Sequence, residues 1–146
     1  MAYDTLSNEA RELEMKAGAL RLQAEEEHKK ERKGNITAWL GYTFESSSAL
    51  TPEFAEFSRQ IKKELIRVMA GWELKDYSRG HFYFSAFFEK AGRYIYVSCS
   101  DVRYFKDDWY NNLLVRTAEG VKDYTGGRNT YATLPELKEN AEKLIK

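Results

Sequence analysis

The stretch from Arg79 to Asp101, RGHFYFSAFFEKAGRYIYVSCSD, decides the fold because it predicts a β-hairpin. Two runs rich in aromatic and β-branched residues flank the short segment KAG. We expect a three-residue turn there, with Gly92 in the left-handed region and Glu89 opposite Arg93. This turn would fix which side chains share a face of the hairpin.

Both faces of the predicted hairpin are apolar, whereas a sheet with one solvated face usually alternates apolar and polar residues. In the expected register one face is largely aliphatic, with Ile95 and Val97, and suits a surface beneath helices. The other face carries Phe82, Phe84, Ala86, Phe88, Tyr94, Tyr96, Ser98 and Ser100. Two helices can cover only one face. The aromatic face is therefore either covered by Trp39, Phe44 or the N-terminal helix, or exposed as a platform for a partner.

The segments around the hairpin predict the rest of the fold. Thr51, Pro52 and Gly71 bound a central amphipathic helix, and Thr133 with Glu136 forms a capping box before a C-terminal helix. WELKDYS and NNLLVRTA predict strands on either side of the hairpin. We expect an α+β fold with an N-terminal helix, the central helix, a three- to four-stranded antiparallel meander and the C-terminal helix. Residues 1–34 form a helical extension and residues 35–146 a compact domain.

The N-terminal helix carries a heptad seam in which leucine alternates with alanine. Its spacing of four and three residues is typical of a coiled coil, and the charged run AEEEHKKERKG follows it. We expect self-association into a homo-oligomer through Leu6, Ala10, Leu13, Ala17, Leu20 and Ala24.

Composition narrows the class of protein. The 146 residues include 23 basic and 23 acidic side chains, so the balance of charge indicates neither a strongly basic nucleic-acid binder nor an acidic mimic of DNA. The one cysteine excludes an internal disulfide and suits a reducing cytoplasm. No apolar run approaches the ~20 residues of a membrane helix, and the first residues do not form a signal peptide. We expect a cytoplasmic protein that binds no membrane.

Two groups of residues invite a chemical interpretation. His81, Asp101 and Cys99 are the ingredients of a thiol nucleophile, but Tyr83 rather than His81 lies across from Cys99 in the expected register. Asp107 and Asp108 lack the glycine turn and distant glutamate of a calcium loop. We expect no metal site and no cofactor. An enzyme that acts through His81, Asp101 and Cys99 is the third hypothesis for the function.

The loop from Lys122 to Tyr131, KDYTGGRNTY, is the second candidate binding element. Its two glycines permit a nest of backbone amides for an anion, and Arg128 adds charge beside it. A tight turn before the last helix is the alternative. With the aromatic face, the candidate binding residues are Phe82, Phe84, Phe88, Tyr94, Tyr96, Arg103, Arg116, Lys122, Tyr124, Arg128, Asn129 and Tyr131.

The run from Asp101 to Leu137, DVRYFKDDWYNNLLVRTAEGVKDYTGGRNTYATLPEL, resembles a segment of small accessory proteins encoded by phages and mobile elements. The resemblance covers the C-terminal third of the chain and implies an anti-defence context, such as anti-CRISPR inhibitors that act by stoichiometric binding. The leading hypothesis is accordingly a non-enzymatic inhibitor that binds a host protein or nucleoprotein complex. The alternative is a nucleic-acid or nucleotide binder that uses the aromatic face and the arginine-bearing loop.

Overall fold

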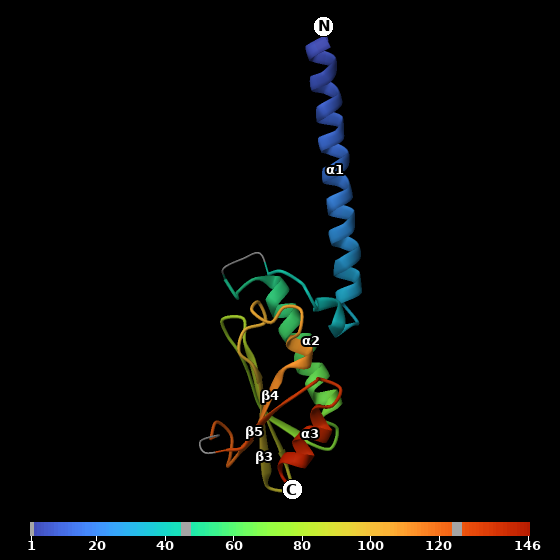
Figure 1. Cartoon of the computed structure of the whole chain (residues 1–146). Coiled ribbons are helices and arrows are strands. Elements are labelled where there is room, and N and C mark those ends of the chain that lie inside the picture. The colour runs from blue at the N-terminus through green and yellow to red at the C-terminus, as the bar shows by residue number, and fades with distance from the viewer. Residues whose placement is uncertain (1, 45–47, 124–126) are drawn as a thin grey trace. The chain divides into compact units, whose positions relative to one another are not determined.

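The computed structural model describes residues 2–44, 48–123 and 127–146. The chain divides between Ala38 and Trp39 into two compact units. The first contains one long helix, and the second, which we call the body, contains a five-stranded sheet and two helices (Figure 1). The expected α+β class and the order of helices and strands are confirmed.

The first unit is dominated by α1, Ala2–Arg32, a single uninterrupted helix. Its leucines are solvent-exposed, with exposed fractions of 63% for Leu6, 67% for Leu13 and 66% for Leu20. A short 3₁₀ helix, η1, follows at Ile36–Trp39. Among the described residues, no helix combines the length and apolar character that crossing a bilayer demands.

The sheet of the body is an antiparallel meander in which the strands lie in chain order. The strands are β1 (Glu73–Arg79), β2 (Phe84–Lys90), β3 (Arg93–Cys99), β4 (Leu113–Ala118) and β5 (Asn129–Ala132), and the 3₁₀ helix η2 (Trp109–Asn111) precedes β4. The fifth strand extends the three or four that the sequence predicts. β5 has only four residues, too few for an alternating apolar pattern to predict a strand.

The expected register of the central hairpin is wrong by one residue. The turn contains two residues, Ala91 and Gly92, both with positive φ (50° and 79°), and Lys90 pairs with Arg93. Two-residue turns of this kind match the right-handed twist of the strands. Because side chains alternate along a strand, the shift moves every residue of one strand to the opposite face relative to its partner.

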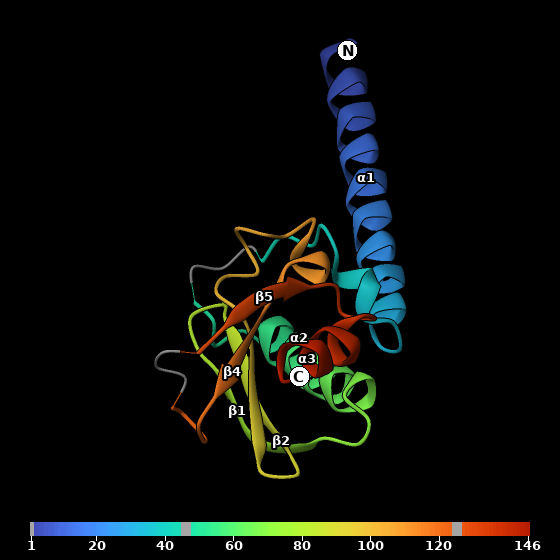
Figure 2. The same cartoon turned by 60° about the horizontal axis from the view of Figure 1, so that its bottom comes forward.

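Helices α2 (Pro52–Val68) and α3 (Leu137–Leu144) lie on the same side of the sheet (Figures 1 and 2). Their apolar stripes are buried, as the sequence predicts for Phe57, Leu65 and Leu137. The covered face of the sheet contributes Phe84, Ala86, Phe88, Ile95, Val97, Cys99, Leu113 and Val115, all buried. This layer is the main core of the body.

Phe82, Phe84 and Phe88 were named as candidate binding residues on a face left open as covered or exposed, and the structure corrects this, because all three have an exposed fraction of 0%. Phe84 and Phe88 point toward the helices as a result of the two-residue turn. Phe82 lies before β2, and its ring contacts Phe44 at 5.6 Å and Phe54 at 5.1 Å between centroids. These three rings are core and cannot contact a partner.

Candidate functional site

The face of the sheet that points away from α2 and α3 is the candidate site, and we call it the open sheet face. Strand pairing arranges its side chains in rows that cross the sheet. The first row contains Ser85, Ser98, Leu114 and Tyr131, the second contains Phe87, Tyr96, Arg116 and Asn129, and the third contains Glu89, Tyr94 and Ala118. Directly opposed side chains on one face lie ~5 Å apart and interact. The rows therefore form one continuous surface.

An aromatic pair occupies the middle of the open sheet face. The rings of Phe87 and Tyr96 lie 4.9 Å apart at 44°, with Phe87 buried and Tyr96 partly exposed. Tyr94, two residues earlier on the same face, is also partly exposed. Partly exposed tyrosines offer area and a hydroxyl to a partner without a large loss of rotamer freedom. Tyr94 and Tyr96 thus lie where a binding platform requires them.

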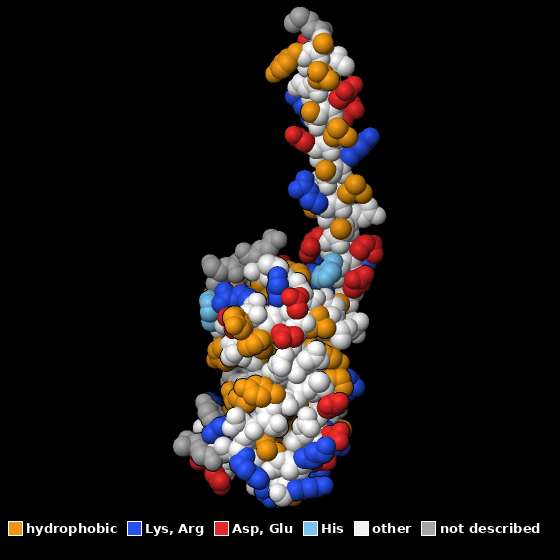
Figure 3. Space-filling model, in the orientation of Figure 1, with side chains coloured by type: hydrophobic (Ala, Val, Ile, Leu, Met, Phe, Trp, Pro, Cys, Tyr) orange, Lys and Arg blue, Asp and Glu red, His pale blue; other side chains and the backbone are white. Residues whose placement is uncertain are grey.

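A groove of about 470 Å³ opens beside the first row. Leu114 and Tyr131 line it together with Ser98 and Phe105, and its lining is mostly apolar. The Tyr131 side chain is 64% exposed. Figure 3 shows an orange patch over β4 and β5 that is surrounded mainly by white atoms. The groove can accept an apolar side chain and offers polar groups at its margin.

Arg116 supplies the positive charge of the second row. Its Nη1 donates a hydrogen bond of 2.9 Å to Oδ1 of Asn129, the residue that pairs with it across β4 and β5. This bond holds the guanidinium on the β5 side of Arg116, whereas on β3 Arg116 is paired in register with Tyr96. Arg116 and Asn129, both predicted as binding residues, are brought together on the open sheet face.

Arg103, by contrast with Arg116, is engaged in contacts that stabilise the fold. Its guanidinium lies 4.1 Å from the centroid of the Phe82 ring and forms an ion pair of 3.0 Å with Asp101. Partial burial favours a higher pKa for Asp101, but hydrogen bonds and charge from Arg103 outweigh it and lower the pKa below its ordinary value. The pair covers a core ring and lies off the three rows of the open sheet face.

Arg128 and Gly127 of the predicted anion-binding loop have structural roles. Arg128 donates from Nη2 to the carbonyl of Leu144, and thus satisfies the C-terminal end of α3. A Cβ on Gly127 would approach the Thr117 carbonyl to 2.2 Å, so glycine is required there by close packing on β4. Lys122 is exposed with a φ of 63°. Tyr124 and Gly126 lie outside the described residues, so the predicted nest of amides lies partly outside them as well.

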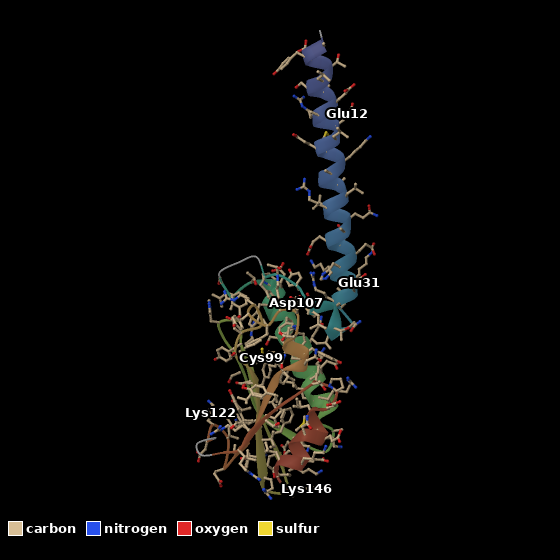
Figure 4. All side chains as sticks on the ribbon, viewed as in Figure 1. Glu12, Glu31, Cys99, Asp107, Lys122 and Lys146 are labelled. Carbon is tan, nitrogen blue, oxygen red and sulfur yellow. The ribbon has the colours of Figure 1, made fainter. Side chains whose placement is uncertain are left out.

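The candidate nucleophile Cys99 lies on the covered face, opposite Phe84. Burial raises the pKa of its thiol to about 11, which keeps it protonated at neutral pH. His81 is exposed beside the Phe82 ring, and Asp101 is paired with Arg103. Figure 4 places Cys99 within the sheet and Lys122 at the outer edge of the body. The three residues therefore do not form a thiol site.

The described residues hold no cluster of three or more histidine, cysteine, aspartate or glutamate side chains with the arrangement of a metal site. Comparison of the chain with protein families, curated proteins and solved structures gave no match. The case for the open sheet face as a binding site therefore depends on the structure of this chain.

Leu114 and Phe87 belong to the open sheet face but were not among the predicted binding residues. Leu114 follows the buried Leu113 in NNLLVRTA, so strict alternation along β4 places one leucine on each face. Phe87 could have been found only with the two-residue turn in place.

Proposed function

We propose that this chain is a non-enzymatic binding protein that captures a partner protein on its open sheet face. The groove beside Leu114 and Tyr131 carries the proposal. An apolar hollow flanked by aromatic side chains is where a partner side chain can be desolvated, and such anchors provide most of the free energy of protein–protein binding. Arg116 and the hydroxyls of Tyr94 and Tyr96 lie in the neighbouring rows of the open sheet face and supply polar contacts beyond the groove.

The charge of the open sheet face favours a protein over a nucleic acid. Arg116 is the one basic residue among the paired positions of its three rows, and it already bonds Asn129. A nucleic-acid partner would require several lysine or arginine contacts to phosphates. The rings and Leu114 instead match the aromatic and aliphatic anchors that protein partners use.

We further propose that the partner is part of a host defence complex and that the chain inhibits it by stoichiometric binding in the cytoplasm of the host cell. The resemblance of residues 101–137 to accessory proteins of phages and mobile elements supports this class. A reduced, buried thiol at Cys99 suits that compartment.

The test is the plating efficiency of a phage on bacteria that carry an active CRISPR defence against it. The wild-type chain should raise plating at least tenfold, and Leu114→Glu should abolish the rise because a carboxylate cannot enter the apolar groove. Leu50→Glu is the matched control, because Leu50 is 92% exposed and lies outside the open sheet face. Its activity should equal that of the wild type.

A chain that rescues no phage across a panel of defence systems would reject the inhibitor class. The open sheet face is rejected as the binding surface if Leu114→Glu and Leu50→Glu rescue equally. The nucleic-acid alternative is examined by fluorescence anisotropy with a labelled oligonucleotide. Binding that falls steeply with salt and is lost in Arg116→Ala would favour that alternative.

A further inference from the structure

Helix α1 exposes an apolar seam along most of its length. Leu6, Leu13 and Leu20 alternate along it with Ala10, Ala17 and Ala24. In proteins, most of the stability of a helix comes from packing its apolar face against a neighbour. The seam ends after Ala24, because the next two positions of the repeat are Glu27 and Glu31. We therefore expect a neighbouring helix to pack against α1 between Leu6 and Ala24.

The order of large and small residues in the seam favours an antiparallel neighbour. In a parallel pair of identical helices, alanine would face alanine and leucine would face leucine, so thin layers would alternate with thick ones. In an antiparallel pair each leucine faces an alanine, and all layers have a similar volume. The seam is complementary to itself about Met15, because the layers become Leu6 with Ala24, Ala10 with Leu20 and Leu13 with Ala17. One sequence thus supplies both sides of every layer.

The charged residues beside the seam disfavour the parallel arrangement. Glu9 and Lys16 flank it on one side, and Glu14 and Arg21 flank it on the other. In a parallel pair the first side of one helix meets the second side of its partner. Glu9 would then face Glu14, and Lys16 would face Arg21, so every such contact would join like charges.

The antiparallel arrangement brings opposite charges together on each side. On one side the order along the axis is Glu9, Lys16 of the second copy, Lys16, and Glu9 of the second copy. On the other side it is Arg21 of the second copy, Glu14, Glu14 of the second copy, and Arg21. Each row has two acids and two bases: its two outer contacts join opposite charges, and its central contact joins a like pair at the twofold axis.

We propose that two copies of this chain associate through α1 as an antiparallel coiled coil whose twofold axis lies level with Met15. Such an interface is isologous, because the same surface is used by both copies. It uses residues that the open sheet face does not, so the dimer and the proposed capture of a partner are separate properties. The proposal defines the orientation and register of the predicted self-association.

Cysteine cross-linking of the full-length chain tests the orientation. Ala10 of one copy faces Leu20 of the other, whereas the two Ala10 residues lie ~15 Å apart along the axis. A disulfide requires Cα atoms within ~7 Å. Under diamide oxidation, a mixture of Ala10→Cys and Leu20→Cys should yield a linked dimer on a non-reducing gel, and Ala10→Cys alone should not. The wild type, with Cys99 buried, controls for the native thiol.

Light scattering of the full-length chain tests the interface. The wild type should have twice the mass of a monomer at tens of micromolar, and Leu20→Glu should be monomeric. Leu22→Glu is the matched control, because Leu22 is 70% exposed and lies off the seam, and it should remain dimeric. A monomeric wild type, an equal effect of the two glutamates, or cross-linking of Ala10→Cys with itself would overturn the proposal.

Discussion

Tyr77 shows how a single polar group is accommodated between the sheet and α2. Its hydroxyl donates to the carbonyl oxygen of Ser58 at 3.0 Å and lies 2.6 Å from the Ser58 Oγ. Burial raises the pKa of Tyr77 to about 12, although the hydrogen bond with Ser58 opposes the rise. The phenol is thus held neutral, and its bonds join β1 to α2.

Replacement of this tyrosine should change both stability and its dependence on pH. Tyr77→Phe should lower the free energy of unfolding by about 1 kcal/mol at pH 8, because the hydrogen bonds are lost. In the unfolded chain the phenol has a pKa near 10, below its folded value, so the wild type loses stability as pH rises from ~10 to ~12. The variant should lose about 1 kcal/mol less than the wild type between pH 8 and pH 11. Urea unfolding at both values measures this.

Tyr131→Phe serves as the control for the Tyr77 experiment. Tyr131 is 64% exposed, so the loss of its hydroxyl should change the free energy of unfolding little at either pH. An identical alkaline loss in Tyr77→Phe and the wild type would contradict the role of the buried phenol. Cys99 is present in all three proteins, and its own alkaline contribution cancels.

Among elements, the turn of the β2–β3 hairpin has the largest consequence for the fold. Ala91 has a φ of 50°, a conformation that costs a residue with a Cβ ~1 kcal/mol. Ala91→Asn should raise the free energy of unfolding by about 0.5–1 kcal/mol, because Asn-Gly is the preferred sequence of this turn type. Ala91→Val should lower it by at least as much. Equal stability of the two variants in thermal unfolding would contradict the turn.

The same turn marks the limit of prediction from the sequence. The strands around it were predicted from their composition, but Lys90 was assigned to the turn instead of the strand. Nothing in EKAG separates a two-residue from a three-residue turn, since alanine is an unfavourable residue at positive φ. The error placed Phe84 and Phe88 on the wrong face, and the packing of α2 and α3 decides the matter.

Central helix α2 was predicted more securely, because its start and apolar spacing agree. Leu65→Ala should cost about 2–5 kcal/mol, since Leu65 is fully buried. Ile66→Ala, at the next residue, is the matched control. It should cost less than about 0.5 kcal/mol, because Ile66 is 46% exposed. Chemical denaturation of both variants measures the difference. Similar losses for the two would show that α2 is rotated about its axis.

At the scale of the whole molecule, the sequence predicted part of the candidate site. Tyr94, Tyr96, Arg116, Asn129 and Tyr131 were singled out, and they lie on the open sheet face. These residues come together only when β3, β4 and β5 pair, and residues 100–112 and 119–128 separate these strands in the chain. Local patterns reveal residue types suited to binding, but only the order of the strands brings them into shared rows.

The two units of the chain should unfold in separate steps. The core of the body contains the sheet, α2 and α3, whereas α1 exposes its apolar seam. Association through that seam makes the stability of α1 depend on protein concentration, since binding shifts the folded population by mass action. Far-ultraviolet circular dichroism should therefore show a first transition that moves upward by several degrees over a hundredfold rise in concentration. Near-ultraviolet signals from the tryptophans of the body should show a second transition that does not move.

Leu20→Glu should remove the concentration dependence of the first transition and leave the second unchanged, because Leu20 is exposed on α1. A single transition common to both signals would contradict this independence and would mean that α1 and the body fold as one cooperative unit.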